Sequence, residues 1–185
     1  MRQTVHTRTS GAILLALLLI PAAIFAVAPD SPSDRDFAFA VGLYKDGLYQ
    51  MAAVRFSDFT LKYAEATRAP QALYLLGECQ FQLEKWDSAR DAFKRFLDKF
   101  PFDELADKAD LRYCQTFLEG ARPADAVKAL QAFTSSRQSS PLLPEAVYWL
   151  GEAQSASKDT SGAESSFRLL LTASPRHSFA PWAGY

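Results

Sequence analysis

Few side chains in this sequence could carry out chemistry. The 185-residue chain has two histidines, His6 and His177, and two cysteines, Cys79 and Cys114. A serine or cysteine nucleophile needs a base, and only His177 lies outside the N-terminal segment, with no orienting partner evident. Cys79 and Cys114 have no metal-site spacing, so we interpret them as small buried hydrophobic residues. A disulfide between them stays open if the protein is exported.

Paired carboxylates are the other candidates for chemistry. Asp87 and Asp91 form one pair, and Asp103 and Asp107 form another, all on predicted helix or turn surfaces. They are most simply solvated helix faces, or first-turn charges that suit the helix dipole. The chain also lacks a glycine-rich phosphate loop. The sequence therefore predicts no enzyme activity, no metal and no cofactor.

The elements that would position these side chains recur every 37 residues. A small residue stands at Ala40, Gly77, Cys114 and Gly151, and an alanine follows 12 residues later at Ala52, Ala89, Ala126 and Ala163. Large apolar residues come 16 residues after the marker, at Phe56, Phe93, Leu130 and Phe167, and 19 after it, at Phe59, Phe96, Phe133 and Leu170. Such a period predicts a stacked array in which no unit buries its apolar face alone.

Each unit is predicted to contain two helices. In the second unit Pro70 opens a helix, and Phe100-Pro101 ends the next one, because a residue before proline leaves the α region. Apolar residues at i, i+4 and i+7 support both helices. The predicted helices span 34–45, 49–63, 70–83, 87–99, 106–119, 123–136, 144–156 and 160–173. The fold class is all-α, with no strand.

The N-terminal 28 residues have the pattern of a secretory leader. Arg2 and Arg8 precede an apolar run over 12–20, Pro21 interrupts it, and small residues continue to Ala28. Cleavage would leave a chain starting near Val27 or Pro29. The alternative is an uncleaved anchor, since residues 11–28 approach the length of a membrane span. Residues 29–33 are predicted to be a linker, and 34–185 the repeat domain.

The repeated unit resembles the tetratricopeptide repeat. The residues that carry the resemblance are Leu76-Gly77, Ala89, Phe93 and Pro101, and again Leu150-Gly151, Ala163, Phe167 and Pro175. The resemblance implies a right-handed superhelical solenoid and a protein-binding role. Four complete repeats would cover about 33–69, 70–106, 107–143 and 144–180, with the start of a fifth at 181–185.

Three segments together with the leader resemble the exported envelope type of this family. They are Tyr74-Leu75-Leu76-Gly77-Glu78, Tyr148-Trp149-Leu150-Gly151-Glu152 and Phe100-Pro101. This type includes the tetratricopeptide protein of the Tol-Pal system and outer-membrane assembly lipoproteins. The resemblance implies a periplasmic or outer-membrane-peripheral location, or an inner-membrane anchor with the domain facing the periplasm. No cysteine lies near the end of the leader, which argues against a lipoprotein.

The resemblance also places one face of each first helix on a concave, peptide-binding groove. The groove residues expected are Phe37, Tyr44, Lys45, Tyr74, Glu78, Phe81, Gln115, Tyr148 and Glu152. Aromatic side chains among acids would suit a peptide with apolar and basic side chains. Alternatively, Tyr74 and Tyr148 simply pack between neighbouring first helices. The chain contains no asparagine, so it lacks the clamp with which chaperone-binding members hold a C-terminal carboxylate.

The partner is therefore expected to be a protein or a peptide. The formal net charge is −1 and no basic stripe is present, which argues against nucleic acid. Membrane contact is expected only through the N-terminal segment, if it is uncleaved, and the oligomeric state stays open. Two alternatives to a scaffold remain: an interaction module of a longer envelope enzyme, and a structural spacer or oligomerisation unit.

The last residues align with the start of a further unit. Pro181 corresponds to Pro70 and Pro144, and Tyr185 corresponds to Tyr74 and Tyr148. This alignment predicts that the reading frame continues beyond Tyr185. It also predicts that residues 176–185 fray, because so short a helix does not hold itself in water.

Overall fold

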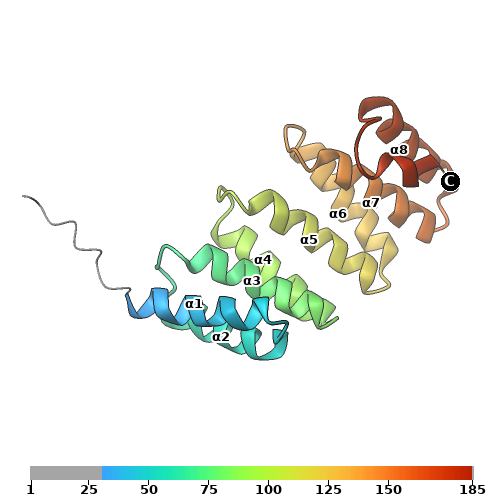
Figure 1. The fold of residues 1–185 in the computed structure, drawn as a ribbon. Helices are drawn as coiled ribbons and strands as arrows, with labels where there is room; N and C mark the ends of the chain where they lie inside the picture. The colour runs from blue at the N-terminus through green and yellow to red at the C-terminus, as the bar shows by residue number, and fades with distance from the viewer. Residues whose placement is uncertain (1–30, 185) are drawn as a thin grey trace, which may run out of the picture.

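A computed structural model of the protein describes residues 31–184. These residues form eight α-helices of equal length, a final 3-10 helix and no strand, which confirms the all-α prediction. The elements are α1 (Pro32–Lys45), α2 (Tyr49–Lys62), α3 (Ala69–Gln82), α4 (Trp86–Lys99), α5 (Ala106–Glu119), α6 (Pro123–Ser136), α7 (Leu143–Ala156), α8 (Thr160–Ala173) and η1 (Ala180–Gly184). Each helix packs mainly on its neighbours in sequence, so the chain is a row of helical hairpins (Figure 1).

The helix boundaries follow the predicted ones closely, and α5, α6 and α8 agree at both ends. The first helix differs most, because α1 begins at Pro32, inside the predicted linker. The Ser31 hydroxyl accepts a hydrogen bond from the Asp34 amide at 3.0 Å, and the Asp34 carboxylate accepts one from the Ser31 amide at 3.3 Å. This capping box starts the helix early. The leader predicted over 1–28 and residues 29–30 lie outside the described residues.

The turn inside each hairpin has one geometry, repeated with the 37-residue period. Gly47, Glu84, Ala121 and Lys158 all have positive φ, between 55° and 75°. The amide of the next residue donates to a carbonyl of the preceding helix, as from Leu48 to Leu43 and from Lys85 to Gln80, both at 2.9 Å. This is the hydrogen bond of a Schellman motif, which normally favours glycine in the left-handed position. Only the first hairpin has glycine at this position. In the other three, a residue with a Cβ adopts the left-handed conformation, which is strained.

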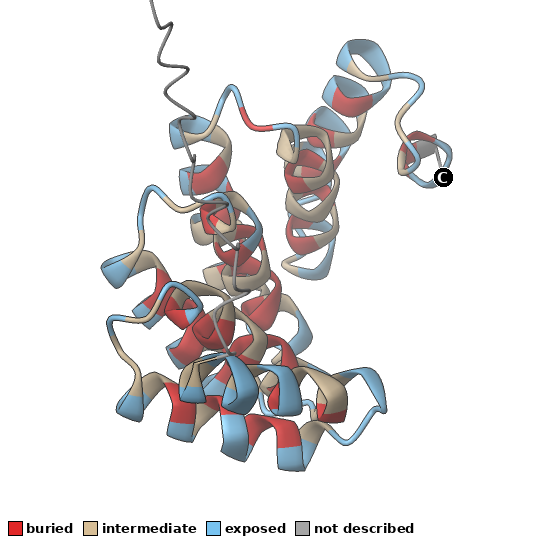
Figure 2. Cartoon of the chain, turned by 60° about the vertical axis from the view of Figure 1, so that its left-hand side comes forward, coloured by how far each residue is buried: buried red, intermediate tan, exposed pale blue. Residues whose placement is uncertain are grey.

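Within a hairpin, the small marker residue lets an aromatic ring reach the backbone of the first helix. A Cβ placed on Gly77 would lie 2.6 Å from Cε1 of Phe93, and a Cβ placed on Gly151 would come closer still to the Phe167 ring. The Phe93 ring is fully buried. The marker glycines therefore leave room for the phenylalanine rings of the facing helices. Across the whole array, the buried residues lie on the inner faces of the helices (Figure 2).

Polar side chains tie helices together, both between consecutive hairpins and within a hairpin. From α4, Arg90 donates to the Thr116 hydroxyl at 3.2 Å and lies over the Phe117 ring at 4.3 Å. At the end of α6, Arg137 forms ion pairs with Asp107 and Asp110 of α5. Asp107 is a first-turn charge of α5, one of the two interpretations that the sequence offered, and it also pairs with Arg137, which the sequence did not predict.

The C-terminal residues pack back on the last hairpin. Ala183 of η1 is 8% exposed and lies in an apolar cluster with Val147 and Leu170. Phe179 stacks on Tyr148 with ring centroids 4.7 Å apart. Up to Gly184 this segment therefore forms a short 3-10 helix where the sequence predicts the start of a fifth first helix. The fraying of residues 176–185 stays a prediction.

Candidate functional site

Three successive first helices meet at a cavity of about 210 Å³. Tyr74 reaches it from α3, and Glu145 reaches it from the first turn of α7. The remaining lining residues are Lys108, Leu111, Arg112 and Gln115 of α5, and Leu142 just before α7. A bound segment at this place would contact three repeats at once.

Arg112 lines the cavity and contacts three of the predicted groove residues. Its Nε lies 2.9 Å from Oε1 of Glu78, and its Nη1 donates to Oε1 of Gln115 at 3.0 Å. Its guanidinium also lies over the Phe81 ring, 5.0 Å from the centroid. The Arg112 side chain is 35% exposed, whereas that of Glu78 is 7% exposed. The arrangement thus covers the acid and presents the guanidinium, held in a fixed orientation.

Burial controls the protonation of the groups around Arg112. Burial raises the pKa of the Glu78 carboxyl, and the nearby Arg112 guanidinium partly opposes this shift. Burial, followed by the neighbouring Glu78 carboxylate, raises the pKa of Tyr74 to about 12. The same two causes raise the pKa of Tyr44. The Tyr74 phenol therefore stays protonated at neutral pH and can donate a hydrogen bond.

Four of the predicted groove residues converge on this cavity. Tyr74 and Gln115 line it, while Glu78 and Phe81 hold Arg112 from behind. Glu78 and Gln115 are only 6% and 4% exposed, so they position other side chains more than they offer a contact surface. Tyr74 also packs against Phe93 of its own hairpin, with ring centroids 5.8 Å apart.

The other predicted groove residues lie away from this cavity. Phe37 packs on Phe59 at 5.6 Å and lines a separate hollow of about 480 Å³ near the start of α1. Tyr44 packs against Tyr49 at 5.5 Å, and Lys45 is exposed at the end of α1. Phe37, Tyr44 and Lys45 therefore do not line the cavity between α3, α5 and α7.

Tyr148 and Glu152 of α7 also lie outside the cavity between α3, α5 and α7. The Tyr148 ring is stacked on Phe179 and packed against Trp149, with centroids 5.3 Å apart in the latter pair. Burial and the neighbouring Glu152 raise the pKa of Tyr148. Tyr148 packs against this C-terminal cluster, whereas the sequence alternative placed it between neighbouring first helices.

Sequence reasoning missed the two cations of the site, Lys108 and Arg112. In the other repeats the position of Arg112 is filled by Ala38, Leu75 and Trp149, so the register assigns it no polar role. A usable signal was present, because Arg112 is the one charged residue among these four. The mapped groove positions did not include it.

The two cysteines are buried, and His177 takes part in a local hydrogen bond. Cys79 and Cys114 are free, with exposures of 0% and 1%, and burial raises the pKa of both thiols. Nδ1 of His177 accepts a hydrogen bond from the Phe179 amide at 3.4 Å. Within residues 31–184 no group of three or more His, Cys, Asp or Glu could hold a metal ion. Among these residues no helix is long and apolar enough to cross a membrane.

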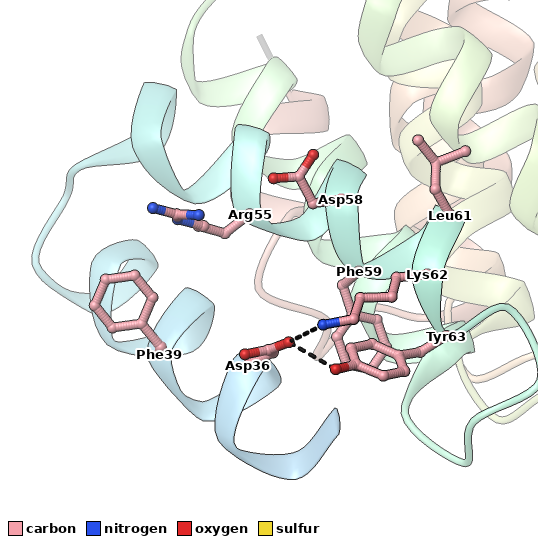
Figure 3. A pocket seen from close by; sticks show the side chains of 8 residues that line it. All are labelled: Asp36, Phe39, Arg55, Asp58, Phe59, Leu61, Lys62 and Tyr63. Carbon is pink, nitrogen blue, oxygen red and sulfur yellow. Dashed lines mark hydrogen bonds and ion pairs between the residues drawn. The ribbon is translucent and has the colours of Figure 1, made fainter. Parts of the chain in front are cut away.

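A second surface lies at the first hairpin, in an open hollow of about 650 Å³ between α1 and α2 (Figure 3). Its lining residues are Asp36, Phe39, Arg55, Asp58, Phe59, Leu61, Lys62 and Tyr63. Asp36 accepts a hydrogen bond from the Tyr63 hydroxyl at 2.8 Å and pairs with Lys62 at 3.4 Å. These bonds hold the start of α1 to the end of α2.

The helical hairpins, their common turn and their small marker residues define a helix-turn-helix repeat solenoid. Two models of the tetratricopeptide repeat family match the chain, one over residues 71–103 and the other over residues 115–178. The chain therefore belongs to the tetratricopeptide repeat proteins, whose repeats act as protein–protein interaction scaffolds.

Solved structures with the same fold share little sequence with this chain. MamA (residues 41 to the end) from Desulfovibrio magneticus RS-1 is 15% identical, with a TM-score of 0.65 over 82% of this chain and 83% of that one. YrrB, described as having an unusual peptide-binding site, is 18% identical, with a TM-score of 0.59 over 80% and 72%. PcrH, solved with the chaperone-binding region of PopB, is 24% identical, with a TM-score of 0.54 over 64% and 94%. None of the curated proteins compared with the chain matches it.

Proposed function

We propose that the protein is a non-catalytic scaffold of the bacterial cell envelope that binds a segment of a partner protein across α3, α5 and α7. The observation that carries the proposal is the cavity to which these three helices contribute. A contact spread over three repeats gives one extended segment several subsites. YrrB and PcrH, which share the fold, are described with a peptide-binding site and with a bound partner segment, and this supports the proposal.

The exposed charges of the cavity favour an acidic ligand side chain. Lys108 is exposed, and Arg112 presents part of its guanidinium, whereas Glu78 is covered. The other lining acid, Glu145, is half-buried and accepts a hydrogen bond from Trp149 Nε1 at 3.2 Å, so two cations face one acid in the cavity. Leu111 and Leu142 supply an apolar wall beside them. We therefore propose a segment with an acidic residue next to an apolar one, in place of the basic segment that the sequence suggested. The buried Glu78–Arg112 ion pair is the physical reason for this revision.

The envelope location depends on the leader-like residues 1–28. In a Gram-negative host, we expect the chain outside the cytoplasm, either cleaved near Val27 or Pro29 or retained at the inner membrane. N-terminal sequencing distinguishes these two forms, and an intact chain in the soluble cytoplasmic fraction would contradict the location. An interaction module of a longer envelope enzyme and a structural spacer remain the alternatives.

Selection from a random peptide library displayed on phage tests the ligand chemistry. We expect the wild-type chain to enrich peptides with an acidic and an apolar residue. Lys108→Glu should weaken binding of such a peptide about tenfold or more, because a hydrogen bond to a charged group contributes about 1.5–3 kcal/mol. Lys108 is exposed, so the variant should keep its helicity.

The matched control is Lys128→Glu, an exposed lysine on α6 outside the cavity. It makes the same charge change and should leave peptide binding unaltered. If no peptide is enriched, or if both variants weaken binding equally, the site is not this cavity.

A further inference from the structure

The outer face of α2 is unusually apolar for a solvent-facing helix. Met51 is 53% exposed, Val54 is 50% exposed, and Leu61 is 76% exposed. Leu48, at the start of the helix, is 47% exposed. Their spacing puts these four side chains on one side of the helix. We call this set the α2 outer face.

The other three second helices have no apolar residue at these four positions, although α8 exposes Leu169 and Leu171 elsewhere on its surface. At the positions of Leu48, Met51, Val54 and Leu61, α4 has Lys85, Ser88, Asp91 and Asp98, α6 has Arg122, Asp125, Lys128 and Ser135, and α8 has Asp159, Gly162, Ser165 and Thr172. Each of these twelve residues is charged, hydroxylated or glycine. The repeat does not require an apolar residue at any of these positions. The α2 outer face therefore has a reason specific to the first hairpin.

Packing within the solenoid does not use this face. The helix packs against α1 on one side and α3 on another, and these contacts bury Ala52, Ala53, Phe56 and Phe59. Beside the α2 outer face, Phe39 of α1 is 55% exposed, and the Arg55 guanidinium lies 5.6 Å from its ring centroid (Figure 3). The exposed cations Arg55 and Lys62 thus border an apolar helix surface, together with the exposed Asp58 and with Asp36, which pairs with Lys62 at 3.4 Å.

The shape of the surface favours a deformable partner over a protein. Four side chains along one helix cover much less than the roughly 1,000 Å² that a specific protein interface needs. An amphipathic helix lying in a bilayer interface needs only a row of apolar side chains with cations beside it. The long stems of lysine and arginine let the charge reach the headgroups.

The sequence before the first hairpin points to the same partner. Residues 11–28 contain no charged residue, and only residues 29–31 separate them from Pro32 of α1. Three residues span at most about 10 Å. The Tyr63 hydroxyl donates to Asp36 at 2.8 Å, so the Leu61 end of α2 lies beside the start of α1. If the apolar segment is in a bilayer, the first hairpin is thereby held close to its surface.

We propose that the α2 outer face lies on the surface of a lipid bilayer. Leu48, Met51, Val54 and Leu61 enter the boundary between headgroups and acyl chains, and Arg55 and Lys62 bind lipid phosphates. This contact goes beyond the N-terminal segment, the only membrane contact expected from the sequence. The inference rests on the proposed envelope location, but it is independent of the peptide-binding cavity.

A spin label within the α2 outer face tests the proposal in the full-length chain. Asp58→Cys places the label between Val54 and Leu61 without removing an apolar side chain, while Cys79 and Cys114 are buried and do not compete for it. Vesicles of phosphatidylethanolamine and phosphatidylglycerol are the probe. On adding them, we expect the label to become at least several-fold more accessible to oxygen relative to a water-soluble nickel complex.

Two further chains serve as controls for this measurement. Arg95→Cys places the label at the matching position of α4 and should stay in an aqueous environment on the same vesicles. Met51→Ser, Val54→Asp and Leu61→Asp, combined with the Asp58→Cys label, give α2 three of the four outer residues of α4. This combination should return the label to water, even where the N-terminal segment keeps the chain on the vesicle.

Each of the other outcomes would overturn the proposal. A label that stays aqueous while the chain floats with vesicles would leave the α2 outer face to a protein partner. Label burial without vesicles that increases with protein concentration would assign the face to a second copy of the chain. The peptide selection contains no lipid and tests Lys108, whereas the spin-label experiment contains no peptide and tests α2. Failure of one proposal can therefore be told apart from failure of the other.

Discussion

The second and third hairpins have the same backbone but distribute side-chain volume in opposite ways. In the second, Gly77 of α3 leaves room for the Phe93 ring of α4. In the third, Cys114 of α5 and the smaller Leu130 of α6 occupy the corresponding positions, and both are buried. Volume removed from one helix is added to its partner. In these two hairpins, the summed volume of the two facing side chains therefore varies less than the volume of either one.

A similar exchange affects the polar residues of the two hairpins. Glu78 and Gln115 correspond in the repeat, and both are buried, at 6% and 4% exposure. Of these two hairpins, the second has an acid there and the third has an amide, and Arg112 of the third hairpin pairs with the acid. The difference between them thus creates the ion pair that shapes the candidate cavity.

The strongest test of this comparison is deletion of the Phe93 ring. Phe93→Ala should lower the free energy of unfolding by about 3–5 kcal/mol, because it leaves a cavity in a fully buried site. Phe93→Leu, which supplies the residue of the third hairpin, should cost less but should not be neutral, since Gly77 offers no compensating side chain. Urea unfolding followed by circular dichroism measures both. Equal losses would show that ring volume does not matter here.

An intermediate effect is expected when the marker glycine is replaced. Gly77→Cys should cost about 1–3 kcal/mol from overpacking against Phe93, partly offset by the roughly 0.5–1 kcal/mol that glycine costs inside a helix. Combining Gly77→Cys with Phe93→Leu gives the second hairpin the pair found in the third. The double variant should be more stable than the sum of the single losses predicts, by more than about 0.5 kcal/mol.

The control for this cycle is Gly42→Cys in α1. An added Cβ there would meet no atom within 4 Å, so the substitution should be neutral or stabilising. If Gly42→Cys costs as much as Gly77→Cys, a general helix effect would replace the packing explanation. If the double-variant effects are simply additive, the two positions do not share volume.

These two hairpins also show how far sequence could predict the fold. The period fixes helix positions because it repeats the same caps and apolar faces, and every predicted boundary lies within two residues of the structure. It could not predict the left-handed turn residues Glu84, Ala121 and Lys158, since none of them is glycine. There the hydrogen bonds of the turn override the local preference.

The candidate site was less predictable than the fold. The register gives the face of a helix on which Glu78 and Gln115 lie, but not how deep neighbouring hairpins bury them. Depth depends on contacts between repeats, such as the one from Arg112 to Phe81. The α2 outer face was missed because apolar residues at helical spacing look the same whether they are buried or exposed.

The smallest expected effect concerns pH and the exchange of Glu78 for its counterpart. Burial raises the folded-state pKa of Glu78 above its ordinary value of 4.5, despite the nearby Arg112. Well below pH 4.5 the carboxyl is protonated in both the folded and the unfolded chain and contributes no difference. As the pH rises, the unfolded chain loses the proton first, so Glu78 increasingly disfavours folding until the pH passes the folded pKa.

Glu78→Gln, which copies Gln115, should remove this dependence. The free energy of unfolding of the variant relative to the wild type should increase from pH 4 toward neutral pH and then become constant. Urea unfolding at a series of pH values measures this difference, and Glu119→Gln, at the exposed end of α5, is the control. A difference that instead falls as the pH rises would mean that the Arg112 ion pair outweighs burial. The acid would then be a source of stability that the third hairpin lacks.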